Sequence, residues 1–109
     1  MAAKVRSTNK QFERSISQGI TLVDFAAPWC RPCRAQKPII AALKKRYQGS
    51  AVVREINIDE NPAMAMRLGI QSIPTIILFK DGGEKFRFIG LQSAETLNLA
   101  LTDLIARSQ

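Results

Sequence analysis

The most apolar stretch of the chain spans residues 20–27 and reads ITLVDFAA. Its β-prone and nearly continuous apolar residues predict a central strand that is covered on both faces. Two further stretches, 51–59 and 75–80, also read as strands. The sequence Asp-Gly-Gly at 81–83 then predicts a hairpin turn, with residues 84–89 as the antiparallel partner of the third strand.

Helical periodicity fills the segments between these strands. Thr8 can cap a first helix that carries Phe12 and Ile16 on one face and ends at Gly19. A second helix is expected over 29–47, interrupted by a kink at Pro38. A short third helix should start at 62, with the preceding asparagine as its cap, and end at 69.

The last helix is expected to begin after Ser93, whose hydroxyl can cap it. Four apolar residues then recur on one face, namely Leu97, Leu101, Leu104 and Ile105. The predicted order is α-β-α-β-α-β-β-α, with a further small strand near Val5. Strands separated by helices are expected to run parallel and the hairpin antiparallel, which gives an α/β fold with a mixed sheet between helices.

Length and composition limit the classes of protein. With 109 residues, no repeat and no linker-like segment, residues 1–109 are expected to form one domain. No stretch approaches the ~20 apolar residues of a membrane span. The first seven residues lack the apolar run of a secretory signal, so we expect a cytoplasmic location.

The chain is basic, with 16 Lys and Arg against nine Asp and Glu, a net charge of +7 and no histidine. The densest basic cluster, residues 44–46, lies at a predicted helix end, where cations favour the helix dipole. No aromatic residues alternate with these cations as a base-stacking surface would require. We therefore expect no nucleic-acid partner, and attraction to acidic proteins instead.

Cys30 and Cys33 are the only cysteines, and they open a helix directly after the central strand. The spacing lets the two sulfurs close or open a small disulfide ring, so we predict a reversible redox pair. Unpaired N–H groups and the helix dipole favour a thiolate at the tip. We expect Cys30 to be exposed and to attack, and Cys33 to be shielded and to resolve.

The residues around the pair bear on its chemistry. Arg31 and Arg34 should stabilise the thiolate, and Pro32 stiffens the turn. Two cysteines could also be half of a zinc site, but no histidine or second pair is present to complete it. Inert buried thiols are a further alternative, which Trp29 and the two arginines make less favourable.

Two residues outside the pair are further candidates. Asp24 interrupts the apolar strand six residues before the first cysteine and should lie beneath the cysteine turn. It is either a structural, hydrogen-bonded carboxylate or an acid whose pKa burial has raised, poised to take the proton of Cys33. Pro74 starts the third strand, where a trans peptide bond is the ordinary state.

These residues together resemble the thioredoxin family over essentially the whole chain. The motifs that carry the resemblance are Val23-Asp24-Phe25, Trp29-Cys30-Arg31-Pro32-Cys33, Pro38, Asn57-Ile58-Asp59, Asn61-Pro62, Gly69-Ile70, Ile73-Pro74-Thr75, Phe79-Lys80-Asp81-Gly82 and Gly90. The resemblance implies the thioredoxin fold, a mixed sheet of four or five strands flanked by four helices. It implies reduction of protein disulfides, with Asp24 handling the proton.

The resemblance also implies that Pro74 is cis and lies beside the disulfide. Trp29, Ile73, Pro74 and Gly90 match the apolar groove that receives a substrate chain, which would pair with the backbone at Ile73. No bound cofactor is implied beyond the Cys30–Cys33 disulfide. Electrons would come from NADPH through a thioredoxin reductase, and the protein would act as a monomer.

The chain departs from the family pattern at four positions. Arg31 replaces a glycine, Ala26 a common tryptophan, Ser72 a common glycine, and Glu55 the usual lysine near Asp24. Glu55 should raise the pKa of that buried acid further unless it turns towards its neighbour Arg54. Two other functions stay open: a more oxidising thiol oxidase or isomerase tuned by Arg31, and a binding module without redox chemistry.

Overall fold

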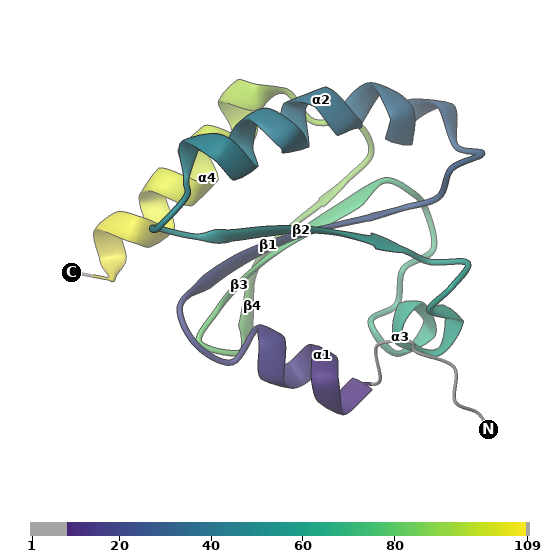
Figure 1. The fold of residues 1–109 in the computed structure, drawn as a ribbon, viewed down its shortest axis with the longest axis horizontal. Coiled ribbons are helices and arrows are strands. Elements are labelled where there is room, and N and C mark those ends of the chain that lie inside the picture. The colour runs from purple at the N-terminus through teal and green to yellow at the C-terminus, as the bar shows by residue number, and fades with distance from the viewer. Residues whose placement is uncertain (1–8, 109) are drawn as a thin grey trace.

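A computed structural model describes residues 9–108 and arranges them around a four-stranded sheet in the order β2-β1-β3-β4 (Figure 1). The strands are β1 (Ile20–Ala26), β2 (Val52–Asn57), β3 (Thr75–Lys80) and β4 (Gly83–Ile89). Every residue of β1 is buried, which confirms that the apolar stretch forms a central strand. The expected strand near Val5 and the Thr8 cap lie outside the described residues.

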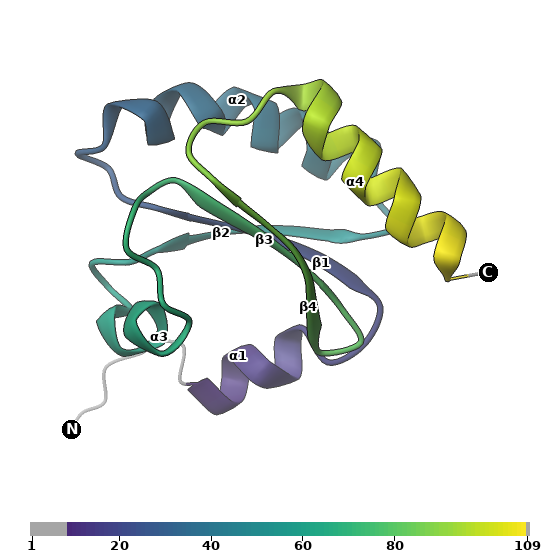
Figure 2. The ribbon, with the colours of Figure 1, turned by 180° about the vertical axis from the view of Figure 1, so that it is seen from behind.

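The described part of the chain has four helices, which cover the two faces of this sheet. In Figures 1 and 2, α2 (Arg31–Arg46) and α4 (Ala94–Arg107) lie on one face, while α1 (Asn9–Ser15) and α3 (Pro62–Arg67) lie on the other. The α2 helix continues through Pro38 as one helix of 16 residues. No helix within residues 9–108 is both long and apolar enough to cross a bilayer.

The direction of β3 corrects one expectation. β1 runs parallel to β2 but antiparallel to β3, although a helix separates β2 from β3. The six residues of α3 extend only about 9 Å, whereas a strand of the same length spans about 20 Å. The short α3 does not carry the chain back along the sheet, so β3 starts at the end where β2 stops and runs back.

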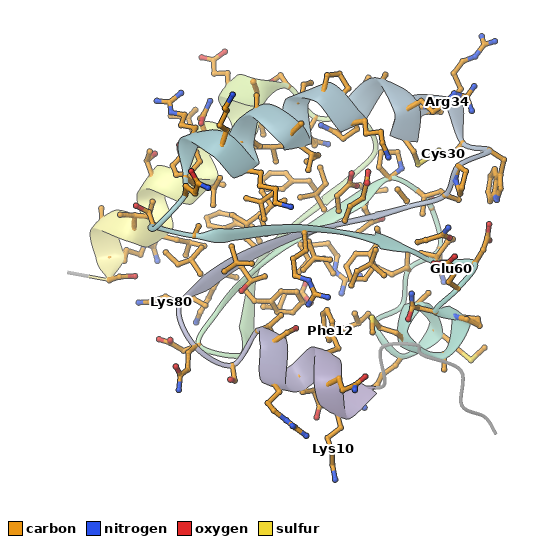
Figure 3. All side chains as sticks on the ribbon, viewed as in Figure 1. Lys10, Phe12, Cys30, Arg34, Glu60 and Lys80 are labelled. Atoms are coloured by element: carbon orange, nitrogen blue, oxygen red, sulfur yellow. A yellow bond between two sulfur atoms is a disulfide. The ribbon has the colours of Figure 1, made fainter. Side chains whose placement is uncertain are left out.

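Alternating side chains of β1 divide the core into two layers. Leu22 packs on the side of α2 and α4 with Leu43 and Leu101, while Phe25 packs on the side of α1 and α3 with Phe12. Figure 3 shows Phe12 pointing from α1 towards the sheet, and Lys10 on the same helix pointing away. Apolar side chains and helices therefore cover both faces of the sheet.

Only some of the helix caps predicted from the sequence are present in the structure. Ser93 caps α4 as predicted, because its Oγ accepts a hydrogen bond from the Thr96 N–H at 3.1 Å. The predicted side-chain cap at Asn61 is wrong, since its amide instead donates to the Asn57 carbonyl at 3.0 Å. The expected limits of the first and third helices were also too long, because turns precede Gly19 and Gly69.

Candidate active site

The turn from β1 into α2 holds the cysteine pair. Cys30 is the N-cap residue of α2, and its extended backbone lets its Sγ accept a hydrogen bond from the Cys33 N–H at 3.2 Å. The two cysteines form a disulfide with their Cα atoms 5.2 Å apart. Figure 3 places Cys30 at the end of the molecule where β1 passes into α2. The first sulfur is therefore aimed at the positive end of a helix.

Both cysteines are buried in this oxidised form. Cys33 is 3 % exposed, as expected, but Cys30 is only 5 % exposed, so the prediction of an exposed Cys30 is wrong. It packs with Ala26 and Ala27 in a small cluster against which Ile73 lies. The loop before β3 therefore shields the sulfur, and the sequence of the helix tip alone carries no sign of that cover.

A backbone hydrogen bond joins Gly90 to Pro74, which directly follows the residue that covers Cys30. The Ile73–Pro74 peptide bond is cis, as the resemblance implies and against the ordinary preference for trans. The Gly90 N–H donates to the Pro74 carbonyl at 2.8 Å, and the Ile73 carbonyl oxygen lies 3.7 Å from the Cys30 Sγ. The Ile73 carbonyl thus lies next to the Cys30 sulfur, and Gly90 is tied to the adjacent Pro74; the role of these residues in binding a substrate chain stays a prediction.

Trp29 completes this surface from the side of the turn. Its side chain is 66 % exposed, and its indole N–H donates to the Asp59 carboxylate at 2.8 Å. That hydrogen bond holds a large aromatic ring in one orientation next to Cys30. An exposed, oriented aromatic ring is a typical contact for a partner protein.

The arginines of the turn point into solvent. Arg31 and Pro32 are exposed, and the Arg34 guanidinium donates to the Pro28 carbonyl at 3.0 Å. In Figure 3, Arg34 projects outward from the start of α2, away from the sheet. The bond to Pro28 braces the turn, and the effect of the two arginines on the thiolate stays a prediction.

Asp24 lies fully buried in β1, and neither of its carboxylate oxygens has a hydrogen-bond partner among the residues that the structure describes. The hydrogen bonds that a structural core carboxylate would make to protein groups are therefore not found among residues 9–108. Burial raises the pKa of Asp24 to about 7, Glu55 raises it too, and Lys37 opposes them. The group can accept or release a proton near neutral pH, as a proton-handling acid must.

Glu55 is next to Asp24 in the sheet, since the two residues are register partners on β2 and β1. Its carboxylate does not turn towards Arg54. It pairs with the Lys37 ammonium of α2 at 3.1 Å. The first of the two sequence expectations is confirmed: the like charge of Glu55 adds to the rise in the pKa of Asp24.

A groove of about 300 Å³ runs beside these groups between α2 and β2. Cys33, Lys37, Glu55 and Glu60 are among its lining residues. The groove therefore connects the shielded sulfur with charged side chains at the surface. Within residues 9–108, no group of three or more metal-binding side chains is present.

Sequence reasoning missed Gln36, which is fully buried one turn after Cys33. Its amide bonds both backbone groups of Gln92, accepting from the N–H at 2.8 Å and donating to the carbonyl at 3.0 Å. It thereby ties the segment that follows Gly90 to α2. A polar residue on the inward face between Cys33 and Ile40 was the available signal.

Comparisons with known proteins agree with this geometry. The Thioredoxin family model matches residues 3–103. A thioredoxin of Staphylococcus haemolyticus is 40% identical over 95 residues, which cover 87% of this chain and 91% of that protein. A Staphylococcus aureus thioredoxin is 39% identical with the same coverage.

Solved structures give the same result for the fold. A mutant thioredoxin from Halobacterium salinarum is 30% identical, with a TM-score of 0.82 over 91% of this chain and 87% of that one. A chain from work on thiol resolution in yeast mitochondrial 1-Cys peroxiredoxin is 26% identical, with a TM-score of 0.83 over 91% and 92%. The fold is the thioredoxin fold. With its disulfide-forming cysteine pair, the chain belongs to the thioredoxin family and is a thiol-disulfide oxidoreductase of the protein-disulfide reductase type.

Proposed function

We propose that Cys30 is the attacking thiolate and Cys33 the resolving thiol in the reduction of protein disulfides. The observation that carries this assignment is the N-cap position of Cys30, whose Sγ accepts the Cys33 N–H. A donor of this kind and the helix dipole stabilise a sulfur anion more than a neutral thiol. Cys33 lies within the first turn, lines the groove and is only 3 % exposed.

The reaction proceeds in two exchanges. The Cys30 thiolate attacks one sulfur of the substrate disulfide, a mixed disulfide forms, and the first substrate thiolate leaves. Cys33 then gives its proton to the Asp24 carboxylate and attacks the Cys30 sulfur. This second exchange closes the Cys30–Cys33 disulfide and releases the second substrate thiolate.

The surrounding residues position the partner and set the potential. Trp29, Ile73, Pro74 and Gly90 form the surface on which the substrate chain lies, and the backbone at Ile73 can pair with it. Pro32 rigidifies the turn, and Arg31 makes the pair more oxidising by stabilising the reduced, ionised form. A reduction potential unchanged in Arg31→Gly would remove Arg31 from this assignment.

Residues 1–109 act as one monomeric domain in the cytoplasm, where they serve redox homeostasis and electron transport. A thioredoxin reductase returns the Cys30–Cys33 disulfide to the dithiol with electrons from NADPH. Acidic partners are favoured, because α2 carries six exposed cations and no acidic residue.

The decisive experiment traps the mixed disulfide. Cys33→Ser should stall with a partner bound through Cys30, whereas Cys30→Ser should trap nothing and lose disulfide reduction. Retained turnover in Cys30→Ser would overturn the assignment. The isoelectric points of trapped proteins, compared with those of the lysate, test the preference for acidic partners.

A further inference from the structure

The buried Asp24 carboxyl has no direct route for exchanging its proton with water. Asp24 is 0% exposed, and both of its carboxylate oxygens lack a hydrogen-bond partner within residues 9–108. Its register neighbour on β3 is Ile76, and the core cluster on this face of the sheet is apolar. An acid that takes a proton from Cys33 in every cycle must release it before the next, so a neighbouring group has to complete the path.

Glu55 is the group that meets this requirement. Register partners on adjacent strands project their side chains to the same face, so Asp24 and Glu55 both face α2. The Glu55 side chain is 35% exposed, and the Lys37 ammonium holds its carboxylate at 3.1 Å. Glu55 is thus a direct neighbour of Asp24 in the sheet, and its side chain also reaches solvent.

The groove gives Glu55 contact with water on the side of Cys33. Its volume of about 300 Å³ exceeds the ~30 Å³ that a water molecule occupies. Cys33, Lys37 and Glu55 all line it. Water that enters the groove can therefore reach the Glu55 carboxylate and take up a proton from it.

We propose that Glu55, anchored by Lys37, carries protons between the buried Asp24 carboxyl and solvent. This inference rests on the proton-accepting role proposed above for Asp24. After Asp24 has taken the Cys33 proton, the Asp24 carboxyl passes that proton to the carboxylate of its register neighbour Glu55, which releases it to water at the surface. The path runs in reverse when the disulfide is reduced, and no electron moves along it.

The other charged groups of the groove do not replace Glu55. Arg34 and Arg54 line it, but a guanidinium keeps its proton at neutral pH. Glu60 also lines the groove, yet it follows the end of β2 and is not a register neighbour of Asp24. Figure 3 shows Glu60 at the end of the molecule that carries Cys30. Glu60→Gln is therefore a matched control, removing the same charge from the same groove.

Proton release during a single oxidation tests the inference. Reduced protein is mixed with an excess of 5,5′-dithiobis(2-nitrobenzoate), whose thiol products stay ionised, so each turnover releases the one Cys33 proton. A pH-indicator dye reports that proton at pH 8, and the fluorescence of Trp29, the single tryptophan, reports disulfide closure. In the parent protein, the two signals should coincide.

In Glu55→Gln, proton release should lag behind disulfide closure by at least about tenfold, while Glu55→Asp and Glu60→Gln should show no lag. If Glu55 acts only through its charge, Glu55→Gln lowers the pKa of Asp24 and speeds proton release, which would overturn the inference. Asp24→Asn separates the two proposals. If its disulfide closure is as fast as in the parent, the role of Asp24 fails. If closure is slow but Glu55→Gln shows no lag, only the relay fails.

Discussion

Replacing Asp24 by asparagine should stabilise the protein, and by an amount that depends on pH. The side chain is buried without a hydrogen-bond partner, and burial raises its pKa from 3.8 to about 7. Each pKa unit corresponds to about 1.4 kcal/mol, so ionised Asp24 lowers the free energy of unfolding by about 4 kcal/mol. Asparagine keeps the shape and avoids the charge.

The sign follows from the protons that each state binds. Below about pH 4, Asp24 is protonated in both the folded and the unfolded chain, and no penalty exists. Between about pH 4 and pH 7, the unfolded chain loses the proton first, so the folded state becomes progressively less stable. Above pH 7 the loss is complete. The gain from Asp24→Asn should therefore be about 4 kcal/mol larger at pH 8.5 than at pH 4.

Urea unfolding of the oxidised protein, followed by circular dichroism at both pH values, measures this difference. Asp103→Asn removes the same charge from an exposed ion pair with Arg107 and should not reproduce the gain. An equal gain from Asp24→Asn at pH 4 and pH 8.5 would refute the reasoning. The more stable variant should also close its disulfide more slowly, since stability and activity compete at a buried acid of this kind.

Three further substitutions each remove one set of side-chain hydrogen bonds. Gln36→Leu leaves both backbone groups of Gln92 unpaired and should cost about 2 kcal/mol in urea unfolding, with faster hydrogen exchange at the Gln92 amide. Ser93→Ala removes the α4 cap and should cost about 1 kcal/mol by the same assay, while disulfide reduction stays unchanged. Trp29→Phe loses the bond to Asp59 and should raise the KM for a protein disulfide severalfold with little change in kcat; an unchanged KM would remove Trp29 from the substrate surface.

Patterns within single segments predicted most of the elements. The apolar run of β1, the Ser93 cap and the cysteine spacing each depend on neighbours within a few residues, and each agrees with the structure. The Asn61 cap failed although it was also a local prediction. Its side chain found a competing acceptor at the Asn57 carbonyl, which only the turn after β2 brings within reach.

The amino-acid sequence by itself determined the alternation of helices and strands, the redox pair at a helix start and the presence of a carboxyl in the most apolar strand. Periodicity and local hydrogen bonding encode these features. Only the tertiary structure decided that β3 runs antiparallel to β1, that Ile73 covers Cys30, and that Lys37 instead of Arg54 pairs with Glu55. Each of these depends on which segments, far apart in the chain, pack against one another, and that choice is made by burying the whole core at once.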